Sequence, residues 1–275
     1  MTRVLAAAVN LGVLLVILSS PAAAQTAPAT RDLERLNWME FREWVPSRVD
    51  TVLLPLGTME AHGVTANGSD IIAPVAIARE IAPRLNAFIA PVVAYGVTGS
   101  LDAYAGGFTI PDEAYRPYVR SVLSGLAHNK FKNIILVNGH GGTQTAILNA
   151  VAAEVGREAG VRTLVINWWS YCSDITLQVF GEDGGHAGEN ENAFMMAIDP
   201  ALVHRERYSP DMTTPNPPPA TWSAYPSPSS ILLYQPGQGY LKFDAEKAKT
   251  YFTRVNDKVA RLVEETIKKW NMAGL

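Results

Sequence analysis

The sequence predicts an α/β fold, a single layered α/β/α domain whose sheet is largely parallel. Short runs rich in Val, Ile and Leu alternate along the chain with segments of helical periodicity, a pattern typical of βα units. These runs lack the alternation of apolar and polar residues that is typical of a sheet with one solvent-exposed face, so helices are expected to cover both faces. A chain of about 250 residues beyond its leader can bury one large core. One domain is therefore expected over residues 25–275.

The first element in chain order is a secretory signal peptide, expected over residues 1–24. Arg3 precedes an apolar stretch of about 15 residues, shorter than the roughly 20 that a membrane span needs. Ala22, Ala23 and Ala24 offer a small-residue cleavage site. The protein is therefore expected to be exported, periplasmic or secreted, with no stable membrane insertion after cleavage. An uncleaved anchor is the alternative.

Four strands and five helices are expected after the leader. The strand candidates are 51–57, 87–94, 133–138 and 161–167. Helices are expected at 71–85, 113–129, 143–159, 189–198 and 245–270, of which the last is amphipathic. Residues 208–240 differ, because Pro and Ser dominate and no periodicity survives. This Pro-rich segment keeps enough apolar side chains to pack, and we expect it to cover the site or to contact another subunit.

Charge and cysteine content narrow the possible partners. The net charge is −3 and no basic block occurs, so the chain lacks the electrostatic footprint of a nucleic-acid-binding protein. Cys172 is the single cysteine, which excludes an intramolecular disulfide. It is expected to be a small buried hydrophobe rather than a nucleophile.

Polar clusters follow three of the predicted strands, where ligands bind in an open parallel sheet. Carboxylates and imidazoles are the ligands that Zn²⁺ and Mn²⁺ accept, and two ions bridged by a carboxylate would lie about 3.5 to 4 Å apart. The sequence therefore predicts a divalent metal site with the candidate ligands Glu60, His62, Asp70, His140 and Glu191.

Each motif also has a structural interpretation. Glu60 and His62 are compatible with a solvated surface, and His140 between glycines with a tight turn. His186 is compatible with a loop histidine, and Glu189 with a carboxylate at a helix start. The clustering favours the metal site, because three of the five histidines lie in these motifs. The aromatic residues Trp168, Trp169 and Tyr104 are candidates either for a pocket wall or for the core.

These motifs resemble those of the creatininase (creatinine amidohydrolase) family. The matching segments are 54–63, Asp70, 137–142 and 186–191, and the resemblance runs from about Leu36 to the C-terminal helix. It implies a metal-dependent hydrolase of carbon–nitrogen bonds in cyclic amides, formamides or peptides, with two Zn²⁺ or Mn²⁺ ions. It also implies a homo-oligomer, commonly a hexamer.

The resemblance implies roles for individual residues. Glu60 and His140 would bind one ion and His62 the other, with Asp70 bridging them. Glu191 would complete the second ion, and His186 would stand near the substrate as a proton shuttle.

The match to creatininase and its relatives breaks at several places, among them residues 63–69, which lack a second histidine and a Pro that are common in relatives. Gly142 stands where that enzyme has a carboxylate, and Thr143 where many relatives have asparagine. Residues 104–109 stand where relatives often have a histidine followed by Phe-Pro-Gly-Thr. The expected substrate is therefore a small amide or short peptide other than creatinine.

The expected function is that of a metal-dependent amidohydrolase, which cleaves an amide, cyclic amide or formamide bond with a metal-activated water. His186 or Glu189 would protonate the leaving nitrogen, a step that a positioned acid accelerates by roughly 10² to 10⁴. Two alternatives stay open: an exported peptidase or lactamase-type hydrolase on the same scaffold, and a binding protein that retains metal without turnover.

Overall fold

The structure is a computed structural model that describes residues 27–182, 184–209 and 240–275. The predicted signal peptide and nearly all of the Pro-rich segment lie outside these residues. The strands are β1 (Thr51–Leu56), β2 (Phe88–Ile89), β3 (Asn133–Asn138) and β4 (Arg162–Asn167). The α-helices are α1 (Trp38–Trp44), α2 (Ser69–Leu85), α3 (Asp112–His128), α4 (Gly142–Ala159), α5 (Trp168–Tyr171), α6 (Ser173–Phe180), α7 (Glu189–Ile198) and α8 (Ala245–Met272).

Within the described residues, the four strands form one parallel sheet in the order β2-β1-β3-β4. The register pairs Leu56 of β1 with Asn138 of β3, and Asn138 with Asn167 of β4. The last residues of three neighbouring strands therefore lie side by side. The segments that leave these strands begin at one edge of the sheet.

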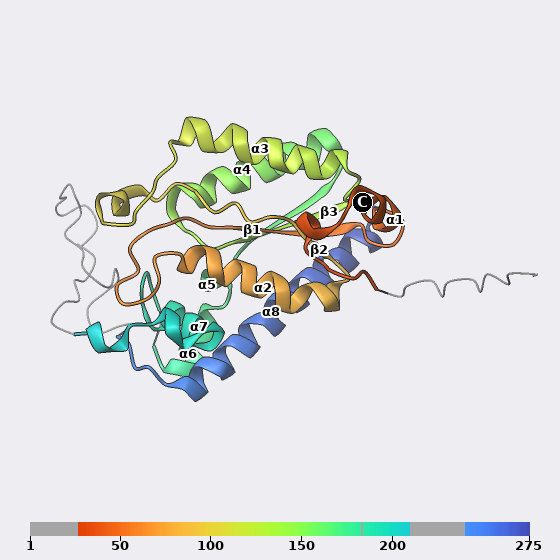
Figure 1. Ribbon diagram of the computed structural model, residues 1–275. Coiled ribbons are helices and arrows are strands. Elements are labelled where there is room, and N and C mark those ends of the chain that lie inside the picture. Colours follow the sequence, from red (N-terminus) through yellow and green to blue (C-terminus); the bar gives the residue numbers. More distant parts are fainter. Residues whose placement is uncertain (1–26, 183, 210–239) are drawn as a thin grey trace, which may run out of the picture.

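Helices cover both faces of the sheet, as Figure 1 shows. Leu53, Ile135 and Val137 pack on one face with residues of α2, α6, α7 and α8. Their sequence neighbours Val52 and Leu54 point to the opposite face and pack with α3 and α4. This division follows from the two-residue period of a strand. The predicted α/β/α layering and the parallel sheet are confirmed.

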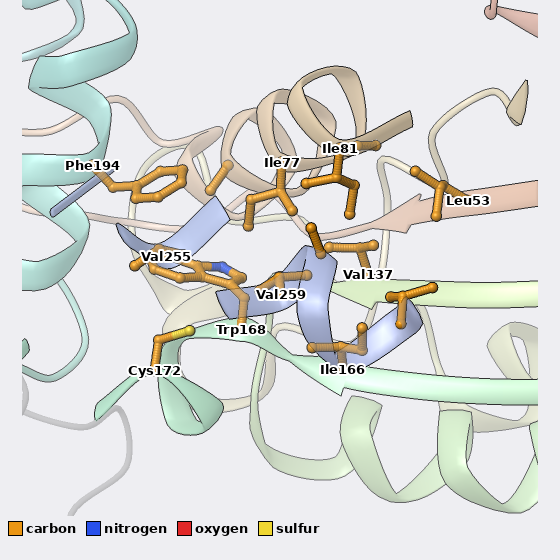
Figure 2. Packing of buried hydrophobic residues seen from close by; sticks show 14 of the residues in the cluster. Leu53, Ile77, Ile81, Val137, Ile166, Trp168, Cys172, Phe194, Val255 and Val259 are labelled. Atoms are coloured by element: carbon orange, nitrogen blue, oxygen red, sulfur yellow. The ribbon is translucent and has the colours of Figure 1, made fainter. Parts of the chain in front are cut away.

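The core between the sheet and α8 extends to the end of β4. Figure 2 shows Ile77 and Ile81 of α2 facing Val255 and Val259 of α8, with Trp168 and Phe194 beside them. The rings of Trp168 and Phe194 lie 4.6 Å apart. Trp168 is thus a core residue, and it separates the end of the sheet from the helical layer. No helix of the described residues is both long and apolar enough to cross a bilayer.

The structure differs from the prediction mainly at β2 and in short helices. The predicted strand 87–94 pairs as a strand only at Phe88 and Ile89, because the segment after Ala90 contains one extra residue relative to β1, which breaks the regular ladder. The residues on either side still follow β1, with Ala90 N–H donating to Leu53 O and Val93 N–H to Pro55 O. The helices α1, α5 and α6 were not predicted. Helix α2 begins at Ser69, so Asp70 lies in its first turn.

Candidate metal centre

Two strand ends and one helix start bring the central candidates together. Glu60 and His62 follow β1, His140 follows β3, and Asp70 lies in the first turn of α2. A Cβ at Gly57 or at Gly139 would clash with the backbone carbonyl of Asp70. The first turn of α2 therefore rests directly on the ends of both strands. Only glycine permits this approach, which brings the Asp70 carboxylate between the two ligand segments.

The first group of candidate ligands comprises Glu60, Asp70 and His140. His140 Nδ1 lies 2.8 Å from Asp70 Oδ2 and 3.2 Å from Glu60 Oε1. The ligand atoms of the three residues lie within 4.8 Å of one another. Glu60 is fully buried and Asp70 nearly so, whereas His140 reaches the pocket surface.

The second group comprises His62, Asp70 and Glu191, the last in the first turn of α7. His62 Nε2 lies 3.1 Å from Asp70 Oδ1 and 3.5 Å from Glu191 Oε2. Asp70 thus presents one carboxylate oxygen to each group. This is the arrangement that a bridging carboxylate requires, and the five residues divide between two groups as the family resemblance implies. Their role as metal ligands stays a prediction.

His186 lies between the two groups, in the loop before α7. Its Nδ1 is 3.2 Å from Glu60 Oε1, and its ring centroid is 4.4 Å from that of His62. Its Nε2 is 2.6 Å from the backbone oxygen of Ala61. Because a carbonyl oxygen only accepts, Nε2 carries the hydrogen. In the neutral ring Nδ1 then offers its lone pair to the site.

Hydrogen bonds to the backbone orient two further ligands. His62 Nδ1–H donates to the backbone oxygen of Glu60 at 3.1 Å, which leaves Nε2 for the site. Glu191 Oε2 accepts from the backbone N–H of Ala187 at 2.7 Å. Metal-binding histidines commonly donate their second N–H to a carbonyl or carboxylate. His62 has this feature.

Buried charges shift the pKa of several groups in the centre. Burial lowers the pKa of His62, but Asp70, Glu191 and Glu60 outweigh it and raise that pKa to about 10. The pKa of His140 also rises to about 10, because the hydrogen bond to Asp70 and the charges of Asp70 and Glu60 outweigh burial. Burial opposes ionisation of Asp70, yet the two histidines hold its pKa well below its usual range. The surrounding carboxylates therefore favour positive charge at the positions of the His62 and His140 rings.

The pKa shifts of Glu191 and His186 both favour the neutral form of the side chain. Burial raises the pKa of Glu191 to about 8, and the charge of Asp70 adds to the rise. Burial lowers the pKa of His186 to about 3, and the neighbouring His62 lowers it further. The His186 imidazole is therefore neutral at pH 7.

The hydrogen bonding of the Glu60 carboxylate shows whether these residues suit a metal ion. Both of its oxygens are buried, and no donor among the described residues has hydrogen-bonding geometry toward either, although two imidazole nitrogens lie near Oε1. A buried carboxylate without partners costs several kcal/mol, on the order of its desolvation. A divalent ion would satisfy these oxygens with the donor types that Zn²⁺ and Mn²⁺ prefer. The candidate ligands therefore fit a divalent metal ion.

The centre opens into a pocket of about 360 Å³. Its floor carries Glu60, Asp70, His140, His186 and Glu191. Its walls come from the segment after β2, the turn after β3, the loop before α7 and helix α5: Val97, Thr98, Gly99, Leu101, Gly139, Gly141, Gly142, Thr143, Gly185 and Trp169. Of the three predicted wall aromatics, Trp169 lines the pocket, Trp168 lies in the core, and Tyr104 is not a lining residue.

Glu189, the second predicted proton-transfer residue, has different surroundings. It is fully buried, does not line the pocket, and accepts a hydrogen bond at Oε2 from the backbone N–H of Lys242 at 2.8 Å. Burial raises its pKa to about 7. A catalytic role for Glu189 stays a prediction, whereas the position of His186 in the pocket favours that residue.

Sequence reasoning missed the wall formed by Val97, Thr98 and Leu101. These residues belong to no strand, and two apolar residues and a threonine give no signal of a pocket. Gly96 and Gly99 were a possible signal, because glycine often marks a close approach of backbone. The wall becomes evident only once Gly96 is seen to pair with Thr109 across a β-bridge.

Comparison with protein families identifies the chain. The model of the family Creatininase, described as creatinine amidohydrolase, matches residues 34–263. A creatinine amidohydrolase of Pseudomonas putida is 26% identical over 208 residues, covering 69% of this chain and 78% of the relative. A mycofactocin precursor peptide peptidase of Mycobacterium ulcerans (strain Agy99) is 32% identical over 190 residues, covering 62% and 67%. A 3-dehydro-scyllo-inosose hydrolase of Thermotoga maritima is 27% identical over 168 residues, covering 57% and 53%.

Solved structures agree on the fold. A crystal structure of creatinine amidohydrolase (creatininase) superposes with a TM-score of 0.72 at 21% identity, covering 86% of this chain and 98% of the other. A structure titled "Creatininase Mn" gives a TM-score of 0.71 at 22% identity with the same coverage. The named relatives are all hydrolases. The chain therefore belongs to the creatininase family and is a hydrolase on the creatininase scaffold.

Proposed function

We propose that this protein is a metal-dependent amidohydrolase that cleaves a carbon–nitrogen bond of a small amide, cyclic amide or formamide. The observation that carries the proposal is the pair of candidate ligand groups that share Asp70, one oxygen toward each. Glu60 and His140 would hold one ion with Asp70, and His62 and Glu191 the other. The ions would be Zn²⁺, Mn²⁺ or one of each.

Bound divalent ions supply an activated water and polarise a carbonyl oxygen. The protein's own groups move the proton. His186 Nε2–H stays on Ala61 O, so the ring is held while Nδ1 faces the pocket. Nδ1 can take a proton at the start of the reaction and give it to the leaving nitrogen, which would otherwise depart as an unstable amine anion.

The pocket supports a small substrate. Its volume of about 360 Å³ is at the lower end of ligand pockets, and Trp169, Leu101 and Val97 supply an apolar wall. Gly142 lines it with no atom within 4 Å of the place of a Cβ, where creatininase carries a carboxylate. This difference supports a substrate other than creatinine.

Metal analysis and a substrate panel test the proposal together. After loading with Zn²⁺ or Mn²⁺ and desalting, we expect two ions per chain, fewer in Glu60→Gln, and none in Asp70→Asn. Glu80→Gln alters an exposed carboxylate on the same helix as Asp70 and should keep both ions. Cyclic amides, formamides and short peptides are then assayed with each protein. A wild-type chain without stoichiometric metal, with both site variants unchanged in stability and activity, would falsify the proposal.

A peptidase is the second candidate, favoured by the relative named as a mycofactocin precursor peptide peptidase. Turnover of the short peptides in the panel, without turnover of cyclic amides or formamides, would select it. A binding protein would retain both ions without turnover of any member of the panel, and His186→Gln would change nothing in it.

We propose further that the protein acts after export and as a homo-oligomer, up to a hexamer. The leader pattern at residues 1–24 supports export, and the family resemblance supports the assembly. Cleavage after Ala24 is checked by intact-mass measurement of the exported protein. Light scattering behind size exclusion checks the assembly.

A further inference from the structure

Gln144 is a fully buried amide in the first turn of α4 that belongs to neither ligand group. Its Nε2 donates to Asn138 Oδ1 at 3.0 Å, and its Oε1 accepts from the backbone N–H of Val97 at 3.1 Å. Val97 is a pocket wall residue, and Asn138 is the last residue of β3. One side chain thus connects the wall to the strand that leads to His140.

The Asn138 end of this connection fixes the backbone of His140. Asn138 Nδ2 donates to His140 O at 2.5 Å, and His140 N–H donates to Asn138 Oδ1 at 3.3 Å. Asn138 Nδ2 also lies 2.8 Å from Asn167 Oδ1, at the end of β4. The candidate ligand His140 is therefore held by an amide that Gln144 itself orients.

The Val97 end fixes the wall. A Cβ at Gly96 would clash with Gln144 Oε1 and with the backbone oxygen of Gly57, so the segment lies directly against the amide. On its other side Thr98 Oγ1 lies 2.7 Å from Thr58 Oγ1, in the segment that leads to Glu60. The wall segment is therefore held between the segment that carries Glu60 and the segment that carries His140. Gln144 connects it to the His140 segment.

We propose that Gln144 is a positioning residue that sets the pocket wall at Val97 and the ligand His140 relative to one another. The inference rests on the proposed metal function. Its chemistry needs an amide, because the side chain must accept from an N–H at one end and donate to an oxygen at the other. An apolar residue of the same length would leave the buried N–H of Val97 without its acceptor and would take from Asn138 Oδ1 one of its two donors.

The variant Gln144→Met keeps the length and removes both hydrogen bonds. We expect its zinc affinity, measured by competition with a chromophoric chelator, to fall about 10- to 100-fold, as for other residues that support a metal ligand. We expect the backbone amide of Val97 to exchange with deuterium about tenfold faster in the metal-free protein, because it loses its acceptor. Gly96→Ala should have both effects, since its methyl group would displace Gln144 Oε1.

Thr176→Val is the control for a buried hydrogen bond lost elsewhere. Thr176 Oγ1 lies 2.9 Å from Tyr251 OH in the core between α6 and α8. This variant should lose stability yet keep wild-type zinc affinity and wild-type exchange at Val97. The proposal is overturned if Gln144→Met exchanges and binds zinc as the wild type does, or if Thr176→Val loses as much zinc affinity. A wild-type protein without zinc affinity overturns the metal function instead, and the exchange of Val97 alone then decides whether Gln144 holds the wall.

Discussion

His186 and Glu189 have different surroundings although only three positions separate them. His186 faces the pocket, whereas Glu189 is turned toward the backbone of Lys242. We expect His186→Gln to lower turnover by roughly 10² to 10⁴ while both ions remain bound. Glu189→Gln should stay within a few-fold of wild type, because the amide oxygen can still accept from Lys242. Steady-state rates with metal content measured on the same samples decide this, and a loss of turnover in Glu189→Gln but not in His186→Gln would assign the acid to Glu189.

We expect Cys172 to make the stability of the protein depend on pH. Burial raises the pKa of this thiol to about 12, whereas an unfolded cysteine titrates near 8.5. The unfolded chain therefore releases a proton above about pH 8.5 that the folded chain retains. The thiol's contribution to the free energy of unfolding is complete below that pH and falls by roughly 2 kcal/mol by pH 10.

Urea unfolding at pH 7 and pH 10 checks this prediction for Cys172. Cys172→Ala removes the thiol, so its free energy of unfolding should fall less between the two pH values than that of the wild type. Equal losses in the two proteins would show that the thiol titrates normally in the fold.

Helix α2 and the ends of β1 and β3 meet through backbone at Gly57 and Gly139. We expect Gly139→Ala to force α2 away from β3, at a cost of about 1–3 kcal/mol or more, and to reduce zinc binding through Asp70. Gly125 in α3 is the matched control, because nothing lies within 4 Å of the place of its Cβ. Gly125→Ala should stabilise the protein by roughly 0.5–1 kcal/mol. Thermal unfolding and zinc titration of both variants test whether this contact sets the site.

The longer elements could be predicted from the sequence because their patterns are local. Strands β1, β3 and β4 are continuous apolar runs, and α2, α3, α4, α7 and α8 repeat apolar residues at helical spacing. Helix α1 also had a local signal, since Asn37 and Glu40 form a capping box. Helix α6 had a local stop signal, because Gly181 ends it in the left-handed conformation. Helix α5 had none, because its four residues are too few to show a helical period.

The convergence of Glu60, His62 and His140 could also be predicted, because strand ends in a parallel sheet meet at one edge whatever the loops do. Asp70 and Glu191 lie in the first turns of α2 and α7, and their candidacy came from their residue types and from the family resemblance.

The pocket wall at Val97 and the role of Gln144 could not be predicted. Both depend on one side chain that joins segments 47 residues apart, and a lone buried glutamine has no pattern in sequence. The orientation of Glu189 toward Lys242 joins residues 53 positions apart and was equally beyond reach.

The molecule as a whole should be more stable with metal than without. The candidate ligands come from the segments after β1 and β3 and from the first turns of α2 and α7, so the complete site exists only in the folded chain. Zinc at 100 times its dissociation constant should raise the free energy of unfolding by about 2.7 kcal/mol, which corresponds to roughly 5–10 °C in Tm. Scanning calorimetry with and without zinc measures the shift. Asp70→Asn should show no shift, and an equal shift in that variant would place the ion elsewhere.

The pairing of Leu56 with Asn138 has a consequence for assembly of the sheet. If β3 slipped by one residue along β1, His140 would move about 3.3 Å relative to Glu60. Coordination distances tolerate only about 0.2 Å. If the candidate ligands bind zinc, a chain with misaligned strands would gain no stability from the ion, whereas a chain with aligned strands would be stabilised by it. Metal uptake during refolding would act as a proofreading step that retains only molecules whose central strands are in register.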